Sequence, residues 1–229
     1  TRIYFLDYFL NYSFFSYFFS VFCLMIVING SNFIDGLNGL LLGYYLIILL
    51  ILYKLGIFTE INLELIQINL LIVLLICLLL FNILNQFFMG DSGAYTLSLI
   101  VSFFLISIYQ NHQIFSPFFI ILLLWYPCFE NLFSIIRKLN IRNSPMSPDN
   151  KHFHQLLFLL IKKKFELNNN YANNYSSFLI LLYNLCILTI GAMNIFSTQL
   201  QITLILFNIV MYLIIYFKLL NTIQVNKLL

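Results

Sequence analysis

Long stretches without a charged side chain constrain this sequence more than any other feature. Five runs contain no Lys, Arg, Asp or Glu and are 27, 18, 26, 38 and 51 residues long: Tyr8–Ile34, Gly36–Tyr53, Leu65–Gly90, Ser92–Phe129 and Leu167–Phe217. About 20 residues of α-helix cross the hydrocarbon core of a bilayer, and helices satisfy their backbone hydrogen bonds internally there. The runs are continuously apolar and do not alternate with a period of two, which argues against a transmembrane β-barrel. The sequence therefore predicts membrane-spanning helices.

The composition excludes most soluble classes of protein. Only 8% of the 229 residues are charged and 62% are hydrophobic, whereas a soluble domain carries about 25% charged residues. A soluble fold cannot hide so much apolar surface from water. A cytosolic enzyme, a disordered tail and a nucleic-acid binder are thereby excluded. We expect one all-α integral-membrane domain over residues 1–229, a polytopic bundle of about seven transmembrane helices.

The basic residues orient the predicted helices in the membrane. The expected spans are approximately 13–31, 38–54, 63–83, 93–110, 115–136, 177–196 and 201–218. Seven of the 11 Lys and Arg residues lie between the fifth and sixth spans: Arg137, Lys138, Arg142, Lys151, Lys162, Lys163 and Lys164. Loops rich in Lys and Arg stay in the cytoplasm, so the loop 137–166 is expected there. Alternation of the spans then places Asn29–Asn38 and Gln86–Ser92 on the same side.

Acidic residues and histidines gather at this predicted cytoplasmic face. Asp35 ends the first span, Asp91 follows the third, and His152 and His154 lie in the basic loop. Ionisable groups at membrane depth usually mark a functional site. Both aspartates also have glycine neighbours, which allow sharp turns and close approach of a ligand to the backbone. Magnesium prefers carboxylates together with substrate phosphates, so the pattern indicates a phosphate-bearing anion bound with magnesium.

Each of these signals also has a simpler interpretation. Asp35 and Asp91 are suitable N-caps for the helices that follow them. His152 and His154 are also compatible with ordinary interfacial residues before an amphipathic helix, since rings two residues apart point to different faces. The basic cluster alone is explained by topology and by attraction to anionic lipids.

Three segments, taken in order, carry a resemblance to a known family. They are Asn29-Gly-Ser-Asn-Phe-Ile-Asp-Gly-Leu-Asn-Gly-Leu40, Phe88-Met-Gly-Asp-Ser-Gly-Ala94 and Ser144-Pro-Met-Ser-Pro-Asp-Asn-Lys-His-Phe-His-Gln-Leu-Leu157. These segments resemble the signatures of the polyprenyl-phosphate N-acetylhexosamine-1-phosphate transferases, a family of integral-membrane enzymes. Phe5–Phe9 and the His-x-His pattern are more similar to the undecaprenyl-phosphate N-acetylglucosamine-1-phosphate transferase branch than to the muramoyl branch.

The resemblance implies a reaction and a set of site residues. A polyprenyl phosphate would attack the β-phosphorus of a UDP-N-acetylhexosamine, in cell-envelope polysaccharide or peptidoglycan synthesis at the bacterial inner membrane, and UMP would leave. By position in the motifs, Asp91 would bind Mg²⁺ or Mn²⁺. Catalysis would involve Asp91 with Asp35, His152 and His154. The substrate-binding residues implied are Asn32, Asn38, Phe88, Gly90 and Arg142. The membrane and the polyprenyl phosphate are implied partners, nucleic acid is not, and a homodimer is a candidate assembly.

Two departures from the family pattern bear on activity. Asn38 stands where many relatives have a second aspartate, and the paired aspartates of an earlier family loop are absent, since no two acids here are adjacent. The chain resembles the C-terminal two-thirds of the family fold, with the N-terminal part missing. A fragment, a split gene and a degenerate copy are alternatives. We expect this chain alone to bind the UDP-sugar weakly at best and to form no polyprenyl-linked product. A non-catalytic membrane scaffold and a secondary transporter are the rival function classes.

Overall fold

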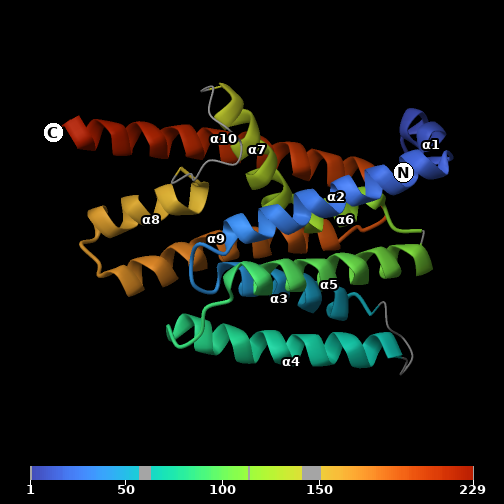
Figure 1. The fold of residues 1–229 in the computed structure, drawn as a ribbon, viewed down its shortest axis with the longest axis horizontal. Coiled ribbons are helices and arrows are strands. Elements are labelled where there is room, and N and C mark those ends of the chain that lie inside the picture. Colours follow the sequence, from blue (N-terminus) through green and yellow to red (C-terminus); the bar gives the residue numbers. More distant parts are fainter. Residues whose placement is uncertain (1, 57–62, 113, 141–150, 229) are drawn as a thin grey trace.

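The computed structural model is a bundle in which most helices lie roughly along one long axis, while α7 crosses it (Figure 1). It describes residues 2–56, 63–112, 114–140 and 151–228. Within these ranges it contains ten helices and no strand: α1 (Tyr4–Leu10), α2 (Ser13–Ile34), α3 (Leu40–Lys54), α4 (Leu63–Ile83), α5 (Gly90–Asn111), α6 (Pro117–Leu123), α7 (Trp125–Asn140), α8 (Phe153–Lys164), α9 (Asn169–Ala192) and α10 (Thr198–Leu228). The predicted all-α class is confirmed.

Several of these helices can cross a membrane. Five are long and apolar enough: Ser13–Ile34, Leu65–Ile83, Gly90–Asn111, Asn169–Ala192 and Thr198–Ile223. The bent pair of α6 and α7 would make a sixth span if it crosses as one. The chain is thus a multi-pass membrane protein, although the expected count of about seven spans is not confirmed among the described residues.

Helix α3 accounts for one of the differences in the span count. It has 15 residues and is therefore about 22 Å long, shorter than the roughly 30 Å hydrocarbon core. Most of its apolar side chains face protein, since Tyr44, Tyr45, Ile48 and Leu49 are fully buried, and it packs against α4 and α9. The uncharged run that predicted a span is therefore explained by a central position inside the bundle.

The predicted span over 115–136 is broken in the structure. Helices α6 and α7 meet at an angle of 72°, three residues before Pro127. Proline has no amide hydrogen, and its ring clashes with the carbonyl four residues earlier, which is that of Leu123. The buried hydroxyl of Tyr44 donates to this carbonyl oxygen at 2.9 Å and accepts from the amide of Tyr126 at 3.4 Å. The break is thus compensated by a side chain of α3.

The described parts of the sequence motifs lie at one end of the bundle. Helix α2 ends and α3 begins there, α4 gives way to α5, and α8 starts beside them (Figure 1). Helices α2 and α7 pack closely, because a Cβ added at Gly30 would lie 2.0 Å from the carbonyl oxygen of Pro127. Gly30 therefore allows a backbone approach that fixes the end of α2 against α7.

Candidate active site

Two of the three motif segments line a single hollow. It has a volume of about 340 Å³ and lies between the end of α2 and the start of α5. The residues that line it are Asn32, Asp35, Gly36, Leu37, Asn38, Asn82, Phe88, Met89, Gly90 and Asp91. Six residues that sequence reasoning singled out, Asn32, Asp35, Asn38, Phe88, Gly90 and Asp91, are therefore brought together.

Asparagine side chains hold the two walls of this hollow together. The Oδ1 atom of Asn82 accepts from the Gly39 amide at 2.5 Å, and its Nδ2 donates to the carbonyl of Phe87 at 2.8 Å. The side chain of Asn38 donates to Oδ1 of Asn85 at 2.5 Å. Gly39 has a φ of 74°, a left-handed conformation that glycine adopts without strain. Asn82 and Asn85 were not identified from the sequence.

The two aspartates do not cap the helices that follow them. Gly39 is at the N-cap position of α3 and Met89 at that of α5, and neither cap has a side-chain hydrogen bond. Asp35 is instead the C-cap residue of α2, and Asp91 lies in the first turn of α5. The simpler interpretation of both residues as N-caps is therefore wrong.

The negative charge of Asp91 acts on the carboxyl group of Asp35. Burial, and then the negative charge of Asp91, raise the pKa of Asp35 to about 7. A like charge nearby disfavours ionisation, and a cation between two such groups would relieve the repulsion. The hollow is therefore electrostatically suited to a positive ion.

The donor set fits magnesium better than a metal that needs a protein cage. The described residues contain no group of three or more His, Cys, Asp or Glu side chains arranged to hold a metal. Magnesium keeps several waters and is commonly held by one or two carboxylates together with substrate phosphates. Asp91 and Asp35 on one hollow match that requirement.

The histidines lie beside the hollow and do not line it. His154 is fully buried, and a Cβ added at Gly36 would lie 2.5 Å from its Nε2 atom. Among the described residues neither ring nitrogen of His154 has a hydrogen-bond partner. Burial lowers the pKa of His154 to about 4, so its ring is neutral at pH 7. His152 stacks on His154 with 5.7 Å between ring centroids.

The remaining predicted residues differ in how they are placed. Phe88 is 72% exposed, so the face of its ring is accessible. The amide of Asn32 donates to the Tyr95 hydroxyl at 3.2 Å. Asn38 is buried, and its side-chain amide donates a hydrogen bond to Asn85. Arg142 lies outside the described residues.

Two charged residues near the site were not predicted to be site residues. Glu130, on α7, is 1% exposed and contacts His152. Lys138, in the last turn of α7, is 7% exposed, and its Nζ lies 5.8 Å from the ring centroid of Phe33. The available signal was the position of Glu130 within an otherwise apolar predicted span, where an acid needs a partner.

Comparisons with known proteins agree with the motifs. The sequence model described as glycosyl transferase family 4 matches residues 1–109. The expected family resemblance is confirmed. Over 138 residues the chain is 28% identical to the undecaprenyl-phosphate alpha-N-acetylglucosaminyl 1-phosphate transferase of Thermotoga maritima, covering 60% of this chain and 41% of that relative.

A second relative gives a similar match. It is the probable undecaprenyl-phosphate N-acetylglucosaminyl 1-phosphate transferase of Bacillus subtilis, 29% identical over 136 residues, which cover 57% of this chain and 37% of the relative. The chain thus spans about two fifths of the length of these curated relatives. No solved structure matches it.

Proposed function

We propose that this chain binds a UDP-N-acetylhexosamine at the hollow between α2 and α5 and takes part in its transfer to a polyprenyl phosphate. N-acetylglucosamine 1-phosphate is the proposed group, as the names of both relatives suggest. The observation that carries the proposal is the convergence of Asp35, Asp91 and the exposed Phe88 on one hollow, with His154 against its Gly36 wall.

The proposed reaction is a displacement at the β-phosphorus of the UDP-sugar. An oxygen of the polyprenyl phosphate forms a bond to that phosphorus, the bond to the bridging oxygen breaks, and UMP leaves. Charge neutralisation and positioning supply most of the rate in such transfers. A magnesium ion held by Asp91 and faced by Asp35 would neutralise diphosphate charge.

The protein side chains would then bind and orient the donor. The exposed ring of Phe88 offers a flat apolar face on which a uracil can stack. Asn32 carries an amide at the lining of the hollow and is suited to polar groups of the nucleotide sugar. His154 supports the wall of the hollow at Gly36, and its two ring nitrogens have no partner among the described residues.

Donor binding and transfer are tested separately. We expect the purified 229-residue chain in detergent to bind radiolabelled UDP-N-acetylglucosamine only when magnesium is present, because the carboxylates otherwise repel the diphosphate. Adding undecaprenyl phosphate and extracting the lipid phase then measures transfer. Equal binding of UDP-N-acetylglucosamine with and without magnesium, or no binding at all, would contradict the proposed function and favour a scaffold.

The proposed cytoplasmic position of the site gives a prediction for labelling in cells. We expect a cysteine at Lys162, on α8, to react with a membrane-impermeant thiol reagent only after bacterial cells are opened. A cysteine at Met193, which is 84% exposed at the other end of α9, should react in intact cells. Both variants would be made with Cys23, Cys77, Cys128 and Cys186 replaced by serine. The reverse pattern would place the hollow on the outer face.

A further inference from the structure

Glu130 is a buried acid on α7 that the proposed reaction does not use. It is 1% exposed, and a charged group removed from water is costly unless it is paired and hydrogen-bonded. Such a residue in an apolar segment usually has a specific partner and a functional role. The contacts of Glu130 identify its partners and point to its role.

Both carboxylate oxygens of Glu130 have partners. Oε1 lies 2.9 Å from Nδ1 of His152 and accepts from the amide of Phe153 at 3.2 Å. Oε2 accepts from the hydroxyl of Tyr212 on α10 at 2.7 Å. A single carboxylate thus joins α7 and α10 to the residues that begin α8.

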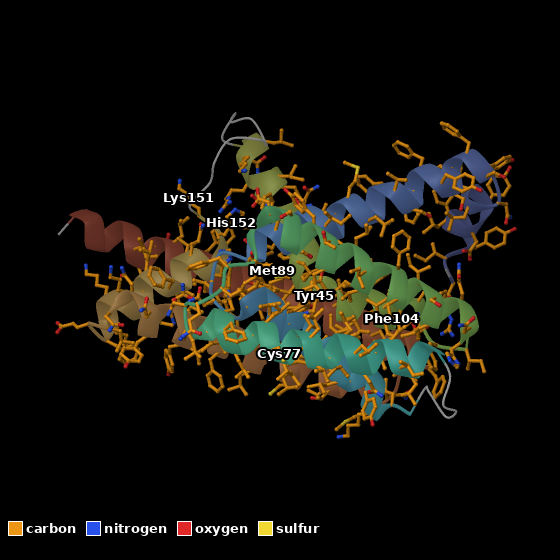
Figure 2. The ribbon with its side chains drawn as sticks, turned by 60° about the horizontal axis from the view of Figure 1, so that its bottom comes forward. Tyr45, Cys77, Met89, Phe104, Lys151 and His152 are labelled. Carbon is orange, nitrogen blue, oxygen red and sulfur yellow. The ribbon has the colours of Figure 1, made fainter. Side chains whose placement is uncertain are left out.

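The residue before His152 is bound by side chains farther along the same two helices. The hydroxyl of Tyr216 donates to the carbonyl oxygen of Lys151 at 3.0 Å, and Arg137 donates to the same oxygen. Figure 2 shows Lys151 and His152 at the same end of the bundle as Met89, which lines the hollow, whereas Phe104 lies toward the other end. Helices α7 and α10 therefore hold the start of α8, which carries the histidines, at the end of the bundle where the hollow lies.

The ring of His152 is fixed in orientation as well as in position. It packs against the Phe33 ring with 4.9 Å between centroids, and it stacks on His154 with an angle of 11° between the ring planes. A carboxylate can only accept, so the contact with Glu130 requires a proton on Nδ1. Nε2 is then the nitrogen left to contact a ligand.

We propose that Glu130 is a positioning residue that holds the proton of His152 on Nδ1 and directs Nε2 toward the bound nucleotide sugar. This inference rests on the proposed function for its ligand, but the geometry that carries it is independent of any ligand. A neutral ring accepts at Nε2 from a hydroxyl or N–H group of the donor. A protonated ring donates there to a phosphate oxygen.

The first measurement needs no variant. In ¹⁵N-histidine-labelled chain in detergent, His152 should show a proton on Nδ1 at pH 7, whereas a free neutral imidazole favours the proton on Nε2. The chain has three histidines, so His112→Gln and His154→Gln identify the resonances. A neutral His152 with its proton on Nε2 would overturn the proposal.

The second measurement uses Glu130→Gln, which keeps the shape and removes the charge. Its amide can donate to Nδ1, so the proton of His152 should move to Nε2. The affinity for UDP-N-acetylglucosamine should fall about tenfold, as expected when a positioning contact is lost. Tyr212→Phe removes only the contact to Oε2, and it should keep the Nδ1 proton and nearly all of the affinity.

A matched control separates positioning from general destabilisation. Asn184 is also buried, and its Oδ1 accepts from the Trp125 indole at 2.9 Å. Asn184→Leu should lower thermal stability but leave the His152 proton and the affinity unchanged. Glu130→Gln with an unchanged Nδ1 proton and affinity would overturn the proposal. If the wild-type chain binds no UDP-sugar, the proposed function fails, while the Nδ1 proton still decides whether Glu130 fixes the ring.

Discussion

Replacing Asp91 with asparagine should nearly abolish the magnesium-dependent binding of UDP-N-acetylglucosamine. Asparagine keeps the shape of the side chain but removes a hard anionic ligand. Asp91 is exposed in the free chain, but its charge would be paired once magnesium and the diphosphate are bound. Loss of one member of a desolvated charge pair costs about 2 kcal/mol or more, so the affinity should fall about 30-fold or more. Equilibrium dialysis of the purified variant over a magnesium titration would measure this loss.

The control for Asp91→Asn removes the same charge elsewhere. Glu166 is exposed just after α8 and does not line the 340 Å³ hollow. Glu166→Gln should therefore bind the UDP-sugar like the wild-type chain. If Asp91→Asn binds UDP-N-acetylglucosamine with wild-type affinity at millimolar magnesium, Asp91 is not the proposed magnesium ligand, regardless of the result for Glu166→Gln.

The helical class was predictable from the sequence, but the number of spans was not. A run without charged residues indicates only that these residues are removed from water. Helices buried inside a bundle and helices in contact with lipid both have such runs. Helix α3 is the example, because Tyr44 and Tyr45 are fully buried against neighbouring helices. The break after α6 had a visible signal in Pro127, yet its compensation by the Tyr44 hydroxyl depends on packing between helices far apart in sequence.

The site was predictable where topology alone brings residues together. Asp35 and Asp91 each lie where a helix ends or begins, so the alternating direction of successive helices was enough to place them at one end of the bundle. The links through Asn82, Asn85 and Glu130 were not predictable. They join residues of different helices, and their partners follow only from how those helices are rotated and packed. The role of each site residue stays a prediction.

The buried ring of His154 should make the stability of the fold depend on pH in the acidic range. Burial lowers its pKa to about 4 in the folded chain, against about 6.5 when unfolded. Between pH 6.5 and pH 4, His154 therefore binds a proton in the unfolded chain but stays neutral in the folded chain. The free energy of unfolding falls as the pH falls through this range. Linkage gives a loss of about 2 kcal/mol between pH 7 and pH 5.

A variant that cannot titrate isolates this effect. His154→Phe keeps a flat ring of similar size against Gly36, and it lacks the proton-binding nitrogens. Asp35 acts in the opposite direction, because its raised pKa favours the folded chain as the pH falls, but it is present in both proteins and cancels in the comparison. The thermal midpoint of the wild-type chain in detergent, relative to that of His154→Phe, should therefore drop between pH 7 and pH 5. Parallel midpoints over this range would mean that His154 already takes up a proton in the folded chain, and that its ring is not sealed behind Gly36.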